Sequence, residues 1–257
     1  MTTSHDLISL ERDEDGVVIL HMKDSNGNNS LGYKFIERLY EVLQELSEDT
    51  EAKVCIFKGL PEVFCAGGDQ DMLIELAEGR LQPTDIMLSR AVLDLPIPTI
   101  AAMEGHAVGG GLTLALCCDI VLCARESRYG CSFMNMGFTP GMGTTRILQE
   151  AVGEYIAAEM MYGGQFFRGS HFENRSNINY VLPREKVWRK ATQVAGRIAE
   201  KPRFALHLLK HHLSMKKRMA FEDARTNEAA MHQICFTREE TLSLIRENYA
   251  PSHSRES

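Results

Sequence analysis

The sequence predicts an α/β protein made of parallel βαβ units, followed by a helical C-terminal region. Short apolar runs alternate with segments of helical periodicity over the first 185 residues, and the pattern is helical throughout from residue 186. Strands and helices that alternate in this way form a parallel sheet covered by helices. We therefore expect a core over residues 1–185 and a helical region over 186–257, packed on the core or on a neighbouring subunit.

The first unit contains a strand, a loop and a helix. The segment 15–22 predicts a strand, in which the aliphatic residues follow an Asp-Gly turn. Residues 24–29 are rich in Ser, Asn and Gly, which favour loops. The segment 33–46 then carries apolar residues at the spacing of one helix face, namely Phe35, Leu39, Val42, Leu43 and Leu46.

The next two predicted strands each lead into a glycine-rich turn and a helix. Strand 54–57 precedes the segment 64–69, which contains Gly68, and strand 98–103 precedes the run of glycines at 109–111. Backbone N–H groups at such helix starts lack intrahelical acceptors and favour negative charge. If the N–H groups of Gly68 and Gly110 converge, they can hold a thioester carbonyl and stabilise an enolate oxyanion.

A single turn of this kind is most often only a tight connection, and dinucleotide binding is an alternative. The glycine run does not have the GxGxxG pattern. Asp119 lies at about the distance of the acidic residue in that motif, but it opens the strand 119–123 and so lies at its wrong end. The sequence therefore argues against a dinucleotide site. A Gly- and Pro-rich passage at 137–143 and helices up to Tyr162 complete the core.

Charge and composition exclude several classes of partner. The formal net charge is -7, with acidic and basic residues interspersed, which gives no footprint for nucleic acid or an anionic membrane. The longest apolar runs are far shorter than the roughly 20 residues of a bilayer span, and the start lacks the features of a secretory signal. We expect a cytoplasmic protein with no membrane segment.

The seven cysteines show no paired CxxC spacing and lie mostly in apolar runs, which predicts reduced, buried thiols rather than zinc ligands. Cys65 is the one cysteine that we place in an exposed loop. A nucleophilic role there would need an activating histidine. The sequence offers none nearby.

Four segments together resemble the crotonase (enoyl-CoA hydratase/isomerase) superfamily over nearly the whole chain. They are the Phe-Cys-Ala-Gly-Gly-Asp segment 64–69, the stretch 102–112 with its three glycines, the strand start 118–120 and the Gly-Phe-Thr-Pro-Gly-Met-Gly segment 137–143. The resemblance implies a ββα spiral core with a C-terminal helical trimerisation region, assembled as trimers or dimers of trimers. It also implies that the amides of Gly68 and Gly110 form the oxyanion hole.

The resemblance further limits the reaction. Crotonase-type hydratases use two glutamates, and the positions that match them hold Thr113 and Phe133. Neither side chain can transfer a proton to or from water as a carboxylate does. Hydration by the usual mechanism is thus disfavoured, and glutamate-dependent isomerisation is weakened.

A more specific resemblance is to the methylglutaconyl-ACP decarboxylases of polyketide β-branching cassettes. It rests on further matches, including residues 102–106, 125–127, 167–169, 181–184, 200–203 and 231–232. It implies decarboxylation of a 3-methylglutaconyl group on the phosphopantetheine of an acyl carrier protein, or on CoA, through a dienolate and without a metal or organic cofactor. It assigns roles to a histidine, which His232 matches, and to a lysine, whose position holds Gln82.

Gln82 is where this assignment departs from the family pattern, because a neutral amide cannot neutralise a carboxylate. Three explanations stay open: a natural variant in which Arg80 or His232 handles the carboxylate, an engineered substitution, or a weak or altered enzyme. The alternative functions are another crotonase activity, such as an enoyl thioester isomerase or hydrolase, and a non-catalytic member that binds acyl carriers. Without the resemblance, His232 would be a solvated or capping histidine.

Other histidines and lysines have simpler interpretations. His106 belongs to the turn before the glycine run, so we expect it to be structural. His207, His211 and His212 share helical spacing with Lys210 in a basic stretch that extends to Arg218, for which a solvated face is the default. A docking patch for an acidic carrier protein that includes Lys216 and Lys217 is the sharper alternative.

Overall fold

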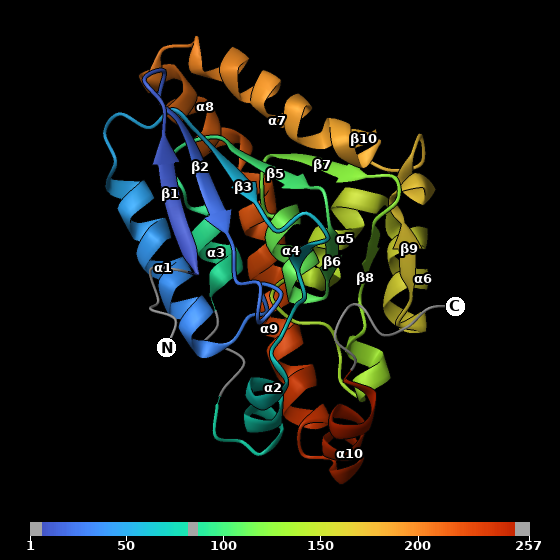
Figure 1. Cartoon of the computed structure of the whole chain (residues 1–257). Coiled ribbons are helices and arrows are strands. Elements are labelled where there is room, and N and C mark those ends of the chain that lie inside the picture. The colour runs from blue at the N-terminus through green and yellow to red at the C-terminus, as the bar shows by residue number, and fades with distance from the viewer. Residues whose placement is uncertain (1–6, 82–86, 250–257) are drawn as a thin grey trace.

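The strands of the computed structural model, which describes residues 7–81 and 87–249, form two sheets (Figure 1). The larger sheet has the order β1-β2-β3-β5-β7-β10 and the smaller one the order β4-β6-β8-β9. Their bounds are β1 Ile8–Arg12, β2 Val17–Met22, β3 Val54–Lys58, β4 Val63–Cys65, β5 Thr99–Met103, β6 His106–Val108, β7 Ile120–Ala124, β8 Arg128–Gly130, β9 Phe166–Arg168 and β10 Tyr180–Leu182.

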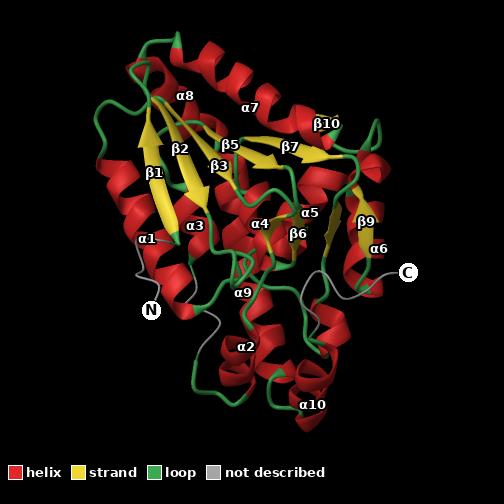
Figure 2. Ribbon diagram, viewed as in Figure 1, coloured by secondary structure: helices red, strands yellow, loops and turns green. Residues whose placement is uncertain are grey.

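Helices surround both sheets (Figure 2). Those before the C-terminal region are α1 Tyr33–Glu48, α2 Gln70–Ala77, α3 Leu88–Leu93, α4 Gly110–Leu116, α5 Thr144–Val152 and α6 Glu154–Gly163, with short 3₁₀ turns η3 Phe133–Met136 and η4 Gly169–Phe172. The C-terminal region contains α7 Arg184–Ala199, α8 Arg203–Leu213, α9 Met215–Cys235 and α10 Glu239–Asn248. None of the helices in the described part has both the length and the apolar composition needed to cross a membrane.

A ββα unit repeats three times along the chain. In the units that begin with β3, β5 and β7, the first strand joins the large sheet and the second, β4, β6 or β8, joins the small sheet. Within each sheet these strands pair in parallel. The predicted α/β class with parallel pairing is therefore confirmed, and the arrangement is the ββα repeat that the resemblance implied.

Helix α7 covers one face of the large sheet, along the top in Figure 1. Its small buried residues Ala191 and Ala195 pack with Ile56 of β3 and Ile100 of β5. Small side chains let the helix approach the aliphatic sheet closely. The expected boundary between 185 and 186 falls near the start of this helix.

The last helix returns to the core at the opposite end of the molecule, where Figure 1 shows α10 beside α2. Ile245 of α10 is fully buried with Phe138 and Met136, and Leu73 and Ile74 of α2 pack against the same cluster. The C-terminal region thus contacts both the sheet and the segment that follows the first glycine turn.

Several elements differ from the sequence prediction, including the short strands β4 and β6, which the sequence placed within the glycine-rich turns. Strand β1 was not predicted; it pairs antiparallel with β2, and only Ile8 is buried among its half-exposed and exposed neighbours. Helix α4 begins at Gly110 rather than Leu112, because Gly109 adopts φ +50° and its carbonyl accepts the Thr113 N–H at 3.0 Å. Gly110 therefore occupies the first helical position.

Candidate active site

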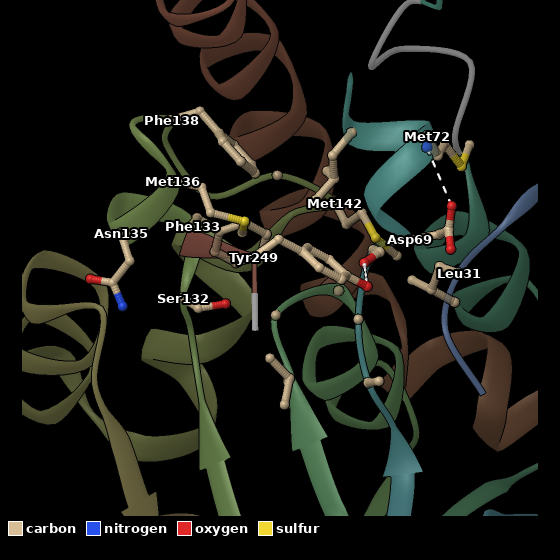
Figure 3. A pocket seen from close by; sticks show the side chains of 18 of the residues that line it. Leu31, Asp69, Met72, Ser132, Phe133, Asn135, Met136, Phe138, Met142 and Tyr249 are labelled. Carbon is tan, nitrogen blue, oxygen red and sulfur yellow. Dashed lines mark hydrogen bonds between the residues drawn. The ribbon is translucent and has the colours of Figure 1, made fainter. Parts of the chain in front are cut away.

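A cavity opens where the glycine turns after β4 and β6 meet the C-terminal helices α9 and α10 (Figure 3). Its free volume is about 1350 Å³ with the open mouth included. Most of the side chains labelled in Figure 3 are apolar, among them Phe133, Phe138 and Met142. The cavity is large enough for a thioester-bound acyl group, and its walls are mostly apolar.

The two glycine turns touch each other at the base of this cavity. Gly67 has φ +87°, and a Cβ there would lie 2.6 Å from the Val108 carbonyl oxygen and 3.8 Å from the Gly110 nitrogen. A Cβ at Gly111 would lie 2.6 Å from the Cys65 carbonyl oxygen. Glycine is required here because the two backbones approach more closely than any side chain allows.

Gly68 and Gly110 both line this cavity. Leu31, in the loop before α1, pairs with the first glycine turn. Its N–H donates to the Gly67 carbonyl, and its carbonyl accepts the Asp69 N–H, so the Gly68 N–H between them takes no part in this pairing. Among the described residues, neither the Gly68 N–H nor the Gly110 N–H donates to a backbone acceptor. Two polar donors without an internal acceptor can bind a ligand oxygen.

His232 lines the same cavity from α9 and is only 6% exposed. Its Nε2 lies 2.8 Å from the Thr139 carbonyl oxygen. Because a carbonyl only accepts, Nε2 carries the proton, which leaves the buried Nδ1 as an acceptor without a partner among the described residues. Burial lowers the pKa of His232 despite the opposing carbonyls of Thr139 and Pro140, so the ring is neutral near pH 7.

The two positions where a hydratase has glutamates provide no carboxylate. Thr113 is buried, and its hydroxyl is 3.1 Å from the Gly109 carbonyl oxygen and 2.5 Å from the Thr144 hydroxyl. Phe133 lines the cavity, and a Cβ at Gly109 would lie 3.3 Å from its ring. Asp69, the one acid in the described lining, caps α2 by accepting the Asp71 and Met72 amides.

The sequence profile of the enoyl-CoA hydratase/isomerase family matches residues 12–250. The chain belongs to this family. Bacillaene synthase decarboxylase from Bacillus subtilis is 35% identical over 246 residues, which cover 96% of this chain and 99% of that protein.

Two solved structures of related proteins agree with this membership. The ECH2 decarboxylase domain of CurF from Lyngbya majuscula is 35% identical with a TM-score of 0.88, covering 95% of this chain and 100% of that one. A chain from a dehydratase/decarboxylase enzyme couple involved in polyketide β-branching is 34% identical with a TM-score of 0.91, covering 95% and 99%. The predicted crotonase-like fold and the resemblance to β-branching decarboxylases are confirmed.

Gln82, the residue at the position of the family's lysine, lies outside the described residues. Helix α2 ends at Ala77, before this position, and the Arg80 side chain that follows it is 58% exposed. Arg80 forms ion pairs with Glu78 and Glu75 and is not part of the cavity lining. The structure therefore gives no support to Arg80 as the group that handles a substrate carboxylate.

Tyr249 is a cavity residue that the sequence did not indicate. Its hydroxyl donates to the Gly68 carbonyl oxygen at 3.1 Å. Burial, followed by the negative charge of Asp69, raises the pKa of Tyr249 to about 12, so the phenol stays protonated. A tyrosine next to a polar C-terminal tail has no local pattern that would reveal this contact.

The expectation of an exposed Cys65 is wrong. Cys65 is the last residue of β4, is fully buried, and donates its thiol to the Asn29 carbonyl oxygen at 2.9 Å. Burial raises its pKa to about 12, which removes it as a nucleophile. In the described part of the chain, the other cysteines also lack disulfide partners, and only Cys235 is not buried.

No group of His, Cys, Asp and Glu within residues 7–81 and 87–249 is arranged to ligate a metal ion.

His106 lies in β6 and lines the cavity, where its Nδ1 accepts the Arg128 N–H at 2.8 Å.

The basic stretch 207–218, for which a solvated face was the default, differs from that prediction. Lys210 is buried and pairs with Asp119, and Lys217 donates to the carbonyls of Leu116 and Cys118. Two of its cations thus point into the protein, so residues 207–218 do not form a continuous basic surface.

Proposed function

We propose that this chain decarboxylates a 3-methylglutaconyl thioester carried on an acyl carrier protein, by way of a dienolate. The observation that supports it best is that two residues whose N–H groups have no acceptor in the described part of the chain, Gly68 and Gly110, line a cavity that has Phe133 where a hydratase has a carboxylate. Such a site can stabilise an oxyanion, and neither Thr113 nor Phe133 can add water as a hydratase glutamate does.

The electron flow fits this site. The bond between the carboxylate carbon and the neighbouring carbon breaks, CO2 leaves, and the electron pair moves through the conjugated system to the thioester oxygen. The Gly68 and Gly110 amides would hold that oxygen, and one such donor is typically worth about 3 kcal/mol in the transition state. The thioester accepts the electrons, so the proposal needs no metal or organic cofactor.

His232 is the group that we assign to proton transfer. With its Nε2 proton on the Thr139 carbonyl, its Nδ1 is the nitrogen that can take up a proton. The resting ring is neutral, so Nδ1 would first take up a proton from solvent and then transfer it to the dienolate. Since burial lowers the pKa of His232, the protonated ring would be a stronger acid than a solvated imidazolium. The α and γ carbons are both chemically possible acceptors.

The test is mass spectrometry of a 3-methylglutaconyl acyl carrier protein incubated with the chain, alongside the corresponding CoA thioester. Loss of CO2 from the acyl group is the expected result. Gain of one water would instead identify a hydratase, and an isomer or free acid would identify another crotonase activity. An acyl carrier that binds but stays unchanged would identify a non-catalytic member.

We also propose that the chain works as a homotrimer, alone or as a dimer of trimers. The side chains of Phe204 and Leu208 on α8 are each 71% exposed, and Met219 on α9 is 70% exposed. Large apolar side chains gathered on two consecutive helices mark an interaction surface. Light scattering should give a trimer or hexamer, and Leu208→Glu should shift it to a monomer; a monomeric wild type would overturn this assignment. A cytoplasmic location remains a prediction.

A further inference from the structure

The loop that lines the cavity beside Gly110 contains a strained peptide. Met142 has φ +62° and Gly143 has φ +86°, so two consecutive residues are in the left-handed region. Methionine rarely adopts this conformation because its Cβ crowds the following carbonyl. Such a conformation persists only where its surroundings hold it.

Two buried side chains hold the peptide that joins these residues, one at each end. The Ser89 hydroxyl of α3 donates to the Met142 carbonyl oxygen at 2.7 Å. The Gly143 N–H donates to Oε2 of Glu228 on α9, also at 2.7 Å. Ser89 is 1% exposed and Glu228 2%.

The other oxygen of Glu228 is also occupied. Oε1 accepts the Thr145 N–H at 2.8 Å and the Thr145 hydroxyl at 2.7 Å, at the first turn of α5. Donors thus occupy both oxygens, and Glu228 is not part of the cavity lining. It therefore cannot exchange a proton with a ligand, and its role is to position other groups.

The loop that carries the held peptide contacts both parts of the candidate active site. A Cβ at Gly110 would lie 2.6 Å from the Met142 sulfur, so this side chain packs against the Cα of Gly110. On the other side of the loop, the Thr139 carbonyl is the partner of His232, and a Cβ at Gly141 would lie 2.7 Å from the His232 ring. Because Glu228 and His232 are one helical turn apart on α9, one helix fixes the loop at two points.

We propose that Glu228, together with Ser89, is a positioning residue that fixes the Met142–Gly143 peptide and so sets the distance between the Gly110 amide, the Met142 side chain and His232. This inference rests on the proposed decarboxylation only for its activity measurement. The position of Met142 is a structural prediction that holds for any reaction in this cavity.

Glu228→Gln is the main variant, since a carboxamide keeps the size but directs an NH2 group toward amide donors. Ser89→Ala is the second variant and releases the same peptide from its other end. Asp223→Asn is the matched control, because Asp223 also joins α9 to α5, through Arg146 at 2.8 Å, but is exposed and does not touch the peptide. Circular dichroism establishes that each variant is folded at the assay temperature.

The first readout is the steady-state release of CO2. We expect kcat to fall about 10- to 100-fold in Glu228→Gln, with KM nearly unchanged, because small misplacements of reacting groups cost this much. Ser89→Ala should fall in the same way, and the double variant should lose less than the product of the two losses, since both act on one peptide. Asp223→Asn should match the wild type.

The second readout does not depend on activity. In protein labelled with ¹³C-methyl methionine, the Met142 signal, assigned through Met142→Leu, should shift or broaden in Glu228→Gln and in Ser89→Ala but not in Asp223→Asn. An unmoved Met142 signal in a folded Glu228→Gln or Ser89→Ala variant would overturn the proposal, as would unchanged kcat. A wild type that releases no CO2 but shows the Met142 shifts would count against decarboxylation alone.

Discussion

The hydroxyl of Tyr249 lies 3.1 Å from the carbonyl oxygen of Gly68 and donates a hydrogen bond to it. This contact joins the end of the described chain to the first glycine turn. The Gly68 carbonyl directly follows the amide that we assign to the oxyanion hole, so the bond restrains the position of that amide. A residue of the C-terminal region thus completes a site built mainly from the core.

Tyr249→Phe removes this bond and leaves the ring in place. We expect kcat to fall about 2- to 10-fold, which corresponds to the roughly 0.5–1.5 kcal/mol that one hydrogen bond contributes. Steady-state decarboxylation measures the effect. Tyr162→Phe is the control, since Tyr162 is 82% exposed on α6. Equal rates for the two variants would show that the Tyr249 hydrogen bond does not affect catalysis.

The sequence predicted the parts of the site that have a local pattern. Gly68 and Gly110 each follow a short apolar strand, and the structure places both in the cavity because β4 and β6 are neighbours in one sheet. His232 was assigned by resemblance alone, since one histidine on a long helix has no pattern of its own. Their catalytic roles remain predictions.

Contacts between distant residues could not be predicted in this way. Tyr249 is 181 positions from Gly68, and Lys210 is 91 positions from Asp119, so no periodicity relates either pair. Cys65 was misplaced because β4 has only three residues, too few to show an alternating pattern. Its burial comes from the adjacent strand and the Asn29 carbonyl, which the local sequence does not reveal.

His232→Ala should abolish or severely reduce turnover while the fold is retained. The ring supplies the proton-transfer group in our proposal, and removing a positioned acid or base typically costs about 10²- to 10⁴-fold. Single-turnover release of CO2 and circular dichroism measure the two effects. Near-normal turnover in the folded variant would exclude His232 from the mechanism.

The buried, neutral His232 should also make stability depend on pH. Its pKa is lowered in the folded protein, so below the unfolded value of about 6.5 the unfolded chain binds more protons, and stability falls as pH decreases from 7.5 to 5.5. Burial lowers the pKa of His21 as well, which acts in the same direction. Urea unfolding should show a weaker pH dependence in His232→Gln than in wild type. The same dependence in His232→Gln and in the exposed-residue control His212→Gln would contradict this.

Lys210→Met should destabilise the fold strongly. The Lys210 Nζ lies 2.9 and 2.8 Å from the two oxygens of Asp119, and its side chain is 2% exposed. Removing Lys210 leaves the partly buried Asp119 carboxylate with only the two hydrogen bonds from Thr99, at a cost of about 3 kcal/mol. Lys216→Met, which breaks an exposed pair with Glu150, should cost less than about 1 kcal/mol. Equal unfolding free energies for the two variants would show that the Asp119 pair contributes little.

Gln82→Lys tests the departure from the family pattern. An ammonium group can neutralise a substrate carboxylate and donate a proton, whereas an amide can do neither. We therefore expect Gln82→Lys to raise decarboxylation of a 3-methylglutaconyl thioester above the wild-type rate, measured as kcat for CO2 release. Gln82→Met, which removes the hydrogen-bonding amide without adding charge, is the control and should not raise it. A rate in Gln82→Lys that is unchanged or lower would mean that this site does not lack a lysine, and that His232 with the Gly68 and Gly110 amides suffices for whatever turnover the wild type shows.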